Sequence, residues 1–210
     1  MITKEEVYML TFDFCNNAQD AAIILLPFIG LRGRQIQDNP LEEMRNLRLE
    51  HINKDKNTIK VIRNDGNNYY EHRMLNNIDD KVIELLIDAY NQEKYLKNNG
   101  EISDWMIIRR NTEMELLNTG YILKPTKKGT NEKVSKGVIS QRLNMIKDLY
   151  GNPFISITNL WLSGMVEYGK QIKKEKGREL IGNDYKEICR RFGHDEVYYS
   201  KIKQIISKYI

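Results

Sequence analysis

The stretch that decides the fold is Ala22-Ile-Ile-Leu-Leu-Pro-Phe-Ile-Gly-Leu-Arg32. Apolar residues fill nearly every position from Ala21 to Ile29, which predicts a helix that is buried on all sides. Asp20 is the expected N-cap and Gly30 the expected end of this helix. Because Arg32 follows directly, its guanidinium begins beside the core and must find an anion or another acceptor.

Helical patterns continue on both sides of this segment. A capping hydroxyl at Thr3, with Glu5 and Glu6 in the first turn, predicts a helix that runs to about Asn16. Apolar periodicity predicts further helices over residues 41–49, 79–97, 135–150, 158–175 and 185–192, and a closing helix marked by Ile202, Ile205, Ile206 and Tyr209. The chain is therefore expected to be mainly helical.

One region changes to an alternating pattern. Polar and apolar residues alternate on both sides of the turn Asp65-Gly66-Asn67, which predicts a hairpin from Asn57 to Leu75. His51-Ile52 could add a strand, Tyr121-Ile-Leu predicts a short buried strand, and Glu101 to Thr119 is mixed. The expected fold class is α+β, mainly α with a small antiparallel sheet, in a single domain of residues 1–210.

Composition fits a globular protein without a membrane span. The 210 residues are 40% hydrophobic and 30% charged, and the longest apolar run, Ala21 to Ile29, is far shorter than the roughly 20 residues that cross a bilayer. The N-terminus has no pattern of a secretion signal, so we expect a cytoplasmic, nucleoid-associated protein. The net charge of +4 is compatible with nucleic-acid binding but does not establish it.

The cysteines and histidines predict no metal site. Cys15 and Cys189 each lie in an apolar-periodic segment, where a thiol acts as a small buried hydrophobe. Three histidines supply too few partners for a zinc site. We therefore expect no disulfide, no metal and no cofactor.

Several sequence matches, in order along the chain, resemble the catalytic domain of the tyrosine recombinases, the phage integrase family. They are Ile2-Thr-Lys-Glu-Glu-Val, the helix that ends in Gly-Leu-Arg32, Glu43 and Leu47 with Glu50-His51-Ile52, Asn57-Thr-Ile-Lys-Val in the hairpin, Tyr121-Ile-Leu-Lys-Pro, and Phe192-Gly-His. The resemblance implies the fold of that domain over nearly the whole chain. The helical DNA-clamping domain that usually precedes it has no counterpart in residues 1–210, so we expect a natural short form or a fragment.

The resemblance also implies a chemistry that can be compared residue by residue. In the family a tyrosine attacks a DNA phosphodiester, two arginines neutralise the developing charge, and a lysine protonates the leaving hydroxyl. Arg32 occupies the position of the first arginine, although an extra loop with Arg34 and Pro40 separates it from the acidic residue. The lysine position falls at or near Arg63, with Lys60 nearby, and a guanidinium is too weak an acid to give up a proton easily.

The remaining positions depart from the family pattern. The segment that aligns with its His-x-x-Arg box is Thr158-Asn-Leu-Trp161, so Trp161 replaces the second arginine. His194 occupies the position of the family's later histidine. A structural role, as a hydrogen-bonded histidine at a helix end, is an equally good interpretation. Lys203 stands where the nucleophile is expected. We therefore expect vestigial catalytic positions and no strand cleavage.

The segments that face DNA in the family still carry cations. We expect helix 135–150 to read bases through Lys136, Gln141 and Arg142. The full set of expected DNA-binding residues is Arg32, Arg34, Lys60, Arg63, Lys127, Lys128, Lys136, Gln141, Arg142, His194, Lys201 and Lys203. Surface lysines often serve only as solvating charges, which is the alternative for this set.

The leading hypothesis is a sequence-specific, double-stranded DNA-binding regulator, similar to the prophage repressors of the SPbeta type that use this fold. A second hypothesis is an active recombinase in which Tyr198, Tyr199 or Tyr209 is the nucleophile. A third is an interaction module whose closing helix docks on a neighbouring subunit through Ile202, Ile205 and Ile206, or which binds a small regulatory protein.

Overall fold

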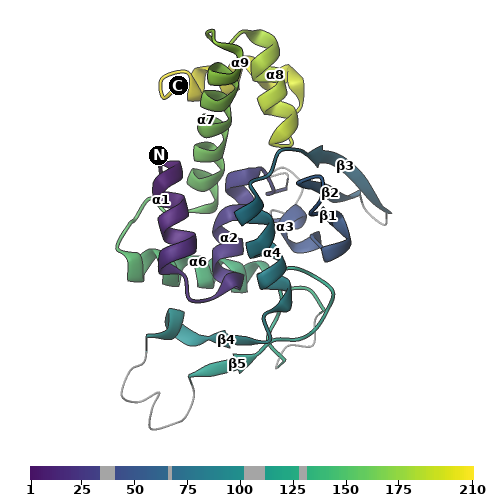
Figure 1. Cartoon of the computed structure of the whole chain (residues 1–210), viewed down its shortest axis with the longest axis vertical. Coiled ribbons are helices and arrows are strands. Elements are labelled where there is room, and N and C mark those ends of the chain that lie inside the picture. The colour runs from purple at the N-terminus through teal and green to yellow at the C-terminus, as the bar shows by residue number, and fades with distance from the viewer. Residues whose placement is uncertain (34–40, 66–67, 102–111, 128–131) are drawn as a thin grey trace.

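A computed structural model describes residues 1–33, 41–65, 68–101, 112–127 and 132–210 (Figure 1). The described part is mainly helical, with two small antiparallel sheets. The α-helices are α1 (Lys4–Tyr8), α2 (Ala18–Ile29), α3 (Glu42–Asn46), α4 (Asp80–Asn91), α6 (Lys136–Tyr150), α7 (Ile157–Lys176), α8 (Gly182–Arg191) and α9 (Tyr199–Ile206). The strands are β1 (Ile52–Asn53), β2 (Thr58–Asp65), β3 (Asn68–Leu75), β4 (Lys94–Leu96) and β5 (Glu113–Glu115).

The N-terminal helices form largely as expected. The Thr3 side chain accepts a hydrogen bond from the Glu6 amide and caps α1, which continues as a π-helix over Met9–Phe14. Helix α2 begins at Ala18, three residues before the predicted start, with Asn17 rather than Asp20 at the N-cap. It ends at Gly30, whose φ of 118° is a left-handed conformation that suits glycine.

Two hydrophobic cores meet along α7. The first core contains most of α2 together with side chains of α4, α6 and the three-stranded sheet, and Leu160 is its last member along the chain. The second core begins at Trp161 and joins the rest of α7 to α8 and α9. Figure 1 shows α7 rising from the body of the molecule towards the end that carries α8 and α9.

The predicted hairpin is present and has its third strand. The strand order is β1-β2-β3, with Ile59 opposite Leu75 and Val61 opposite Arg73. Ile59, Val61 and Arg63 are buried while Lys60 and Ile62 are half-buried, so alternate residues of β2 face the body of the protein. One face of this sheet therefore brings Arg63 towards the core.

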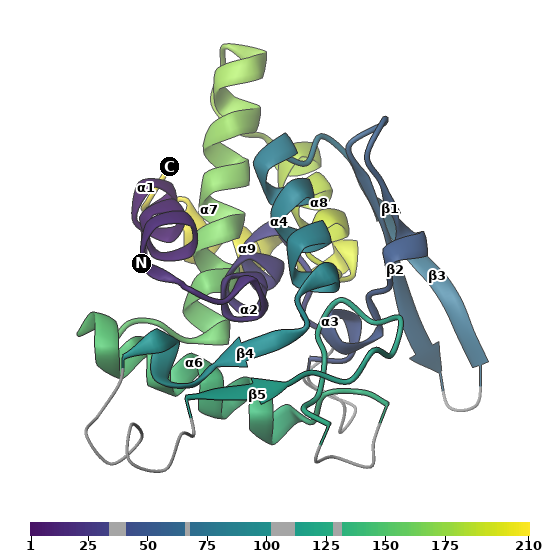
Figure 2. The same ribbon diagram turned by 60° about the horizontal axis from the view of Figure 1, so that its bottom comes forward.

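A second, two-stranded sheet corrects the predicted helix 79–97. Helix α4 stops at Asn91, and the chain continues as β4, which pairs with β5 (Figure 2). The side chain of Asn17 holds this sheet against α2, because it bonds to the backbone of Leu96 and to Gln92. The predicted strand at Tyr121 is a single bridge to Arg48 rather than a strand.

The closing helix packs on its own chain. Ile202 and Ile206 are buried in the second core, and Ile205 packs against it. The apolar face that was expected to dock on a neighbouring subunit is thus largely filled by α7 and α8. This observation counts against self-association through α9.

Candidate nucleic-acid interface

The buried carboxylate of Glu43 accepts hydrogen bonds from two guanidinium groups and two backbone amides. Arg73 donates to its two oxygens at 2.6 and 2.9 Å, and Arg63 donates to Oε1 at 2.7 Å. The backbone amides of Arg32 and Gly33 bond to Oε2 at 3.0 and 3.1 Å. Burial works to raise the pKa of Glu43, but the arginines and the amide outweigh it and hold this pKa at about 2.

Arg32 extends from the end of α2 without a carboxylate partner among the described residues. Its Nη2 donates to Thr158 Oγ1 at 2.9 Å, and its Cζ lies 4.7 Å from the centre of the Trp161 ring. The whole residue is 6% exposed. The guanidinium is therefore fixed by one hydroxyl and one aromatic face, and its charge is not neutralised by an ion pair.

Trp161 also contacts His194. The two ring centres lie 4.7 Å apart, so the indole lies against both a guanidinium and an imidazole. Burial first, and then the charges of Arg32, Arg73 and Lys201, lower the pKa of His194 to about 4. His194 is therefore neutral at pH 7, and it adds no charge to the guanidinium groups of Arg32, Arg63 and Arg73.

Several buried polar atoms of this cluster have no hydrogen-bond partner within the described residues. They are Nε and Nη1 of Arg63, Nε1 of Trp161 and Nε2 of His194. A buried donor without a partner costs about 1–3 kcal/mol, and an unpaired buried charge costs more. We define the cationic cluster as Arg32, Arg63, Arg73 and Glu43 with the adjacent Trp161 and His194; it combines excess positive charge with unused donors.

Arg73 is the member of the cluster that sequence reasoning missed. In addition to Glu43, it donates to the backbone carbonyls of Gly30 and Arg191 at 2.6 and 2.9 Å, so it joins the hairpin to the ends of α2 and α8. No motif marks this arginine. The available signal is its register, because Arg73 lies opposite Val61 on the face of the hairpin that also carries Arg63.

Residues 1–210 match the family model described as MrpR, C-terminal catalytic domain. The chain belongs to this family. Its fold is that of a tyrosine recombinase-family catalytic domain, which confirms the resemblance and the predicted fold class. A comparison with curated proteins found no match for this chain.

Arg142 and Arg63, which were expected to bind DNA, are buried to the same degree as Arg32 in this member of the MrpR family. Arg142 is 5% exposed, lies 4.3 Å from the centre of the Tyr95 ring, and makes long bonds of 3.4 Å to Gln19 and to the Lys124 carbonyl. Arg63 is 5% exposed and bonded to Glu43. These guanidinium groups, like that of Arg32, face into the protein, and their direct contact with DNA stays a prediction.

The other expected contacts differ in how freely they reach solvent. Gln141, Lys201 and Lys203 are exposed, while Lys60 and Lys136 are half-buried. Lys127 is exposed but pairs with Glu115 at 2.6 Å, which offsets its charge. Arg34 and Lys128 lie outside the described residues.

Three further cations lie in or just after α3 and in the segment before α6. Arg45 donates to the Val134 carbonyl at 2.8 Å, and Lys133 donates to Asn46 at 2.7 Å. Arg48 donates to the Tyr121 hydroxyl at 2.8 Å. All three are half-buried. No sequence motif predicts their positions, because their hydrogen-bond partners come from distant segments of the chain.

Tyr198, Tyr199 and Tyr209, the tyrosines considered as nucleophiles, have surroundings that differ from those of the cluster arginines. Tyr198 and Tyr209 are exposed, and the Tyr199 ring lies under Lys186 at 5.7 Å. Within the described ranges, no tyrosine hydroxyl bonds to Arg32, Arg63 or Arg73. Lys203 is exposed on α9 and its ammonium lies 5.9 Å from the Tyr185 ring centre.

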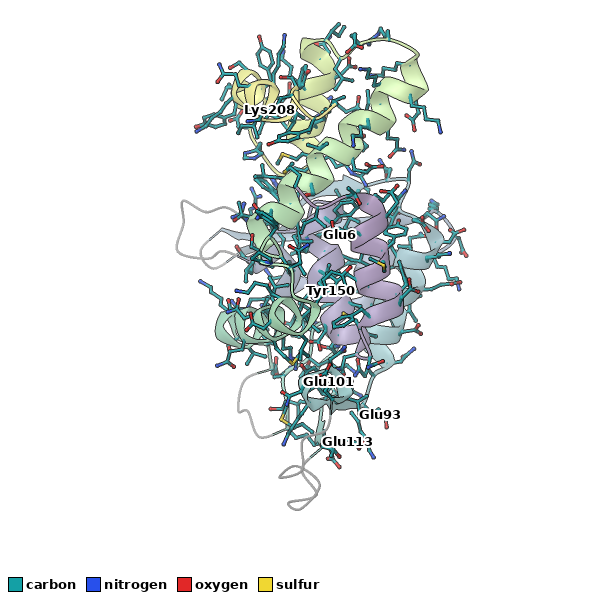
Figure 3. The ribbon with its side chains drawn as sticks, turned by 90° about the vertical axis from the view of Figure 1, so that its left-hand side faces the viewer. Glu6, Glu93, Glu101, Glu113, Tyr150 and Lys208 are labelled. Atoms are coloured by element: carbon teal, nitrogen blue, oxygen red, sulfur yellow. The ribbon has the colours of Figure 1, made fainter. Side chains whose placement is uncertain are left out.

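Three exposed glutamates lie at the end of the molecule that carries the two-stranded sheet. Figure 3 shows Glu93, Glu101 and Glu113 together at the end that carries β4 and β5, far from Lys208. Lys94 pairs with Glu113 at 3.0 Å and Lys127 pairs with Glu115 at 2.6 Å, so lysines balance part of the negative charge at this end. Among the described residues there is no group of three or more metal-binding side chains. No described helix is both long and apolar enough to cross a membrane.

Proposed function

We propose that this domain binds double-stranded DNA at specific sequences and represses transcription, as a phage or prophage regulator, without cutting the DNA. The observation that carries the proposal is the position of Trp161 against Arg32, where the family pattern requires a second arginine. An indole cannot neutralise the charge that develops on a phosphorane. Loss of one such donor typically lowers a rate by about 10²–10³.

Two further features support the loss of cleavage. Lys203 occupies the position expected for the nucleophile, and an ammonium group cannot form a phosphotyrosyl bond. Arg63 stands near the position of the lysine that acts as general acid, and its side chain is engaged with Glu43. The nucleophile, one arginine and the acid are thus all altered.

The remaining charge supports DNA binding. Arg32 keeps an unneutralised guanidinium at the family's first arginine position, and Lys201 and Lys203 add exposed cations near His194 and on α9. Phosphate contacts of this kind give affinity that falls steeply with salt. Sequence preference would come from the exposed side of α6, where Gln141 remains available.

The test begins with selection of bound fragments from the source genome, followed by mobility shifts between about 50 and 200 mM salt, the range over which phosphate contacts weaken strongly. We expect saturable binding to a small set of sites and a drop in transcription from a reporter that carries them. Absence of saturable binding at the lowest salt would refute DNA binding. Binding without any effect on the reporter would refute repression alone.

A second candidate function is strand exchange with a rearranged site. Arg73 favours it, because this residue brings another guanidinium into the cationic cluster. A nicked suicide substrate distinguishes the two functions. An active enzyme leaves a covalent protein-DNA adduct that disappears when one of Tyr198, Tyr199 or Tyr209 is changed to Phe, whereas a repressor leaves none.

A further inference from the structure

A pocket outside the cationic cluster lies between the start of the 3-10 helix Leu49–His51, the end of α4 and the turn before Tyr121. Its lining is Arg48, Leu49, Glu50, Tyr90 and Gly120, and its volume is about 360 Å³. Pockets that take small molecules usually measure about 300–1,000 Å³, so this one is large enough for a two-ring compound. None of its lining residues belongs to the cationic cluster.

Arg48 supplies the charge of the pocket. Its guanidinium lies 4.4 Å from the centre of the Tyr121 ring and bonds to the hydroxyl of the same residue at 2.8 Å, which fixes its orientation. Within the described part of the chain, no carboxylate forms a salt bridge with it, although the charges of Glu50 and Glu132 contribute to raising its pKa after the hydrogen bond to Tyr121. A guanidinium has five donors, so Arg48 retains several for a ligand.

The shape of the guanidinium and its surroundings select the ligand chemistry. The planar fork of an arginine matches the two oxygens of a carboxylate. Glu50 at the rim would repel a doubly charged phosphate more strongly than a singly charged carboxylate. Tyr90, whose ring has the Lys124 ammonium 5.2 Å from its centre, and the 37% exposed Leu49 contribute an aromatic and an aliphatic side chain to the lining.

Gly120 is the lining residue that has no side chain. Its φ is +74°, and a Cβ atom added there would have no heavy atom within 4 Å. A side chain at this position would therefore project into open space. Because Asn tolerates the left-handed conformation better than other side chains, Gly120→Asn is a suitable way to obstruct the pocket.

We propose that this pocket binds a small carboxylic acid with a flat apolar body, held by Arg48 and packed between Leu49 and Tyr90. The proposal concerns a site separate from the cationic cluster, and it stands whether or not the domain represses transcription. The carboxylate of a peptide C-terminus offers the same anionic group, and the choice of probe separates this source from a free acid.

The experiment is an NMR titration of the isotope-labelled chain with 2-naphthoate. We expect saturable shifts at the amides of Arg48 and Gly120 with a Kd of about 1 mM, the weak affinity usual for a ligand of this size. Comparison titrations use 2-naphthamide, inorganic phosphate and a short peptide ending in Phe. The naphthamide and the phosphate are expected to bind at least about tenfold more weakly, which corresponds to 1.4 kcal/mol.

Variants locate the binding. Arg48→Met and Gly120→Asn should each weaken naphthoate binding at least about tenfold, whereas Gly151→Asn should leave it unchanged. Gly151 is a matched control because its φ is also +74° and a Cβ there also has no neighbour within 4 Å. Equal melting temperatures of the two Asn variants establish that both fold.

The possible outcomes either support or refute the proposal. Equal affinity for naphthoate and naphthamide would refute carboxylate recognition, and equal affinity for phosphate would make this a general anion site. Tighter binding of the peptide than of naphthoate would show that the occupant is a chain terminus and not a free acid. Unchanged binding in Gly120→Asn, or no saturation by about 10 mM, would refute the site itself.

Discussion

The guanidinium of Arg73 donates to both oxygens of the Glu43 carboxylate, at 2.6 and 2.9 Å. This pair connects β3 to α3, and Arg63 reaches the same carboxylate from β2. Glu43 thus holds the hairpin against the end of α2, from which Arg32 extends. The stability of the cationic cluster depends on one negative charge.

Glu43→Gln should strongly destabilise the fold. The substitution keeps the size of the side chain but leaves Arg63 and Arg73 without their counter-charge, and breaking a buried ion pair in this way costs about 3–5 kcal/mol. Urea unfolding at pH 7 measures the loss. Glu5→Gln, at an exposed position in the first turn of α1, is the control and should change the free energy of unfolding by less than about 0.5 kcal/mol.

Acid should remove the same stabilisation. The folded pKa of Glu43 is about 2, below its ordinary value of 4.5, so the stabilisation is complete above pH 4.5 and is lost as the pH falls towards 2. The slope of unfolding free energy against pH in this window should flatten in Glu43→Gln. An unchanged slope would mean that other carboxylates dominate the acid unfolding.

His194 should stay neutral well below pH 6. Its folded pKa of about 4 lies below the ordinary 6.5, so its contribution to stability is complete above pH 6.5 and is lost as the pH falls through 4. The NMR titration of its ring protons measures this pKa directly, and His51 and His72 serve as internal comparisons. A midpoint near 6.5 for His194 would contradict the burial of this ring beside Trp161.

Arg32→Ala should weaken DNA binding by reducing phosphate contact. One lost phosphate contact lowers the slope of log K against log salt by about 0.9. Lys170→Ala, which changes an exposed cation on α7, should leave the slope unchanged. Circular dichroism checks that both variants fold, and equal slopes in both would mean that Arg32 does not contact the backbone of DNA.

Gly193→Ala should destabilise the protein more than a substitution that only strains the backbone. Its φ is +71°, and a Cβ there would lie 2.7 Å from Arg73 Nη1 and 3.2 Å from Arg63 Nη2. Gly177→Ala is the matched control, since φ is +60° and no heavy atom lies within 4 Å. Strain alone costs about 1–2 kcal/mol, and a larger loss in Gly193→Ala than in Gly177→Ala isolates the clash with the arginine pair.

Ile206→Ala tests whether α9 packs against its own chain or against a second copy. Ile206 is fully buried in the second core, so its truncation should lower the free energy of unfolding by about 2–5 kcal/mol. The loss of unfolding free energy should be the same at two protein concentrations that differ about a hundredfold, because the stability of a contact within one chain does not depend on protein concentration. A melting temperature that rises with concentration in the wild type would instead indicate docking in trans.

The elements that rest on local patterns could be predicted from the sequence. The buried helix that ends at Gly30, the hairpin and α6 with its Ser135 cap all form where apolar spacing and turn residues place them. Helix α4 ends early because the chain turns at Gln92 to begin β4, and the side chain of Gln92 bonds to Asn17, far away in the sequence. Periodicity alone cannot detect such a partner.

The difference between local patterns and distant partners also explains which residues of the candidate site could be predicted. Arg32 could be found because it follows a helix whose end is clear. The burial of Arg142 could not be predicted, because helical spacing does not reveal that Gln19, Tyr95 and Lys124 surround it from other elements. Arg73 was missed for the complementary reason, since only the pairing of β2 with β3 brings it to Glu43.

Gly164 on α7 lies so close to α2 that a Cβ there would overlap the carbonyl oxygen of Phe28. The two backbones therefore touch without intervening side chains, which makes a stiff joint between the helix that delivers Arg32 and the helix that carries Trp161. Any larger residue at position 164 would push these two helices apart, and Arg32 would then move relative to Trp161.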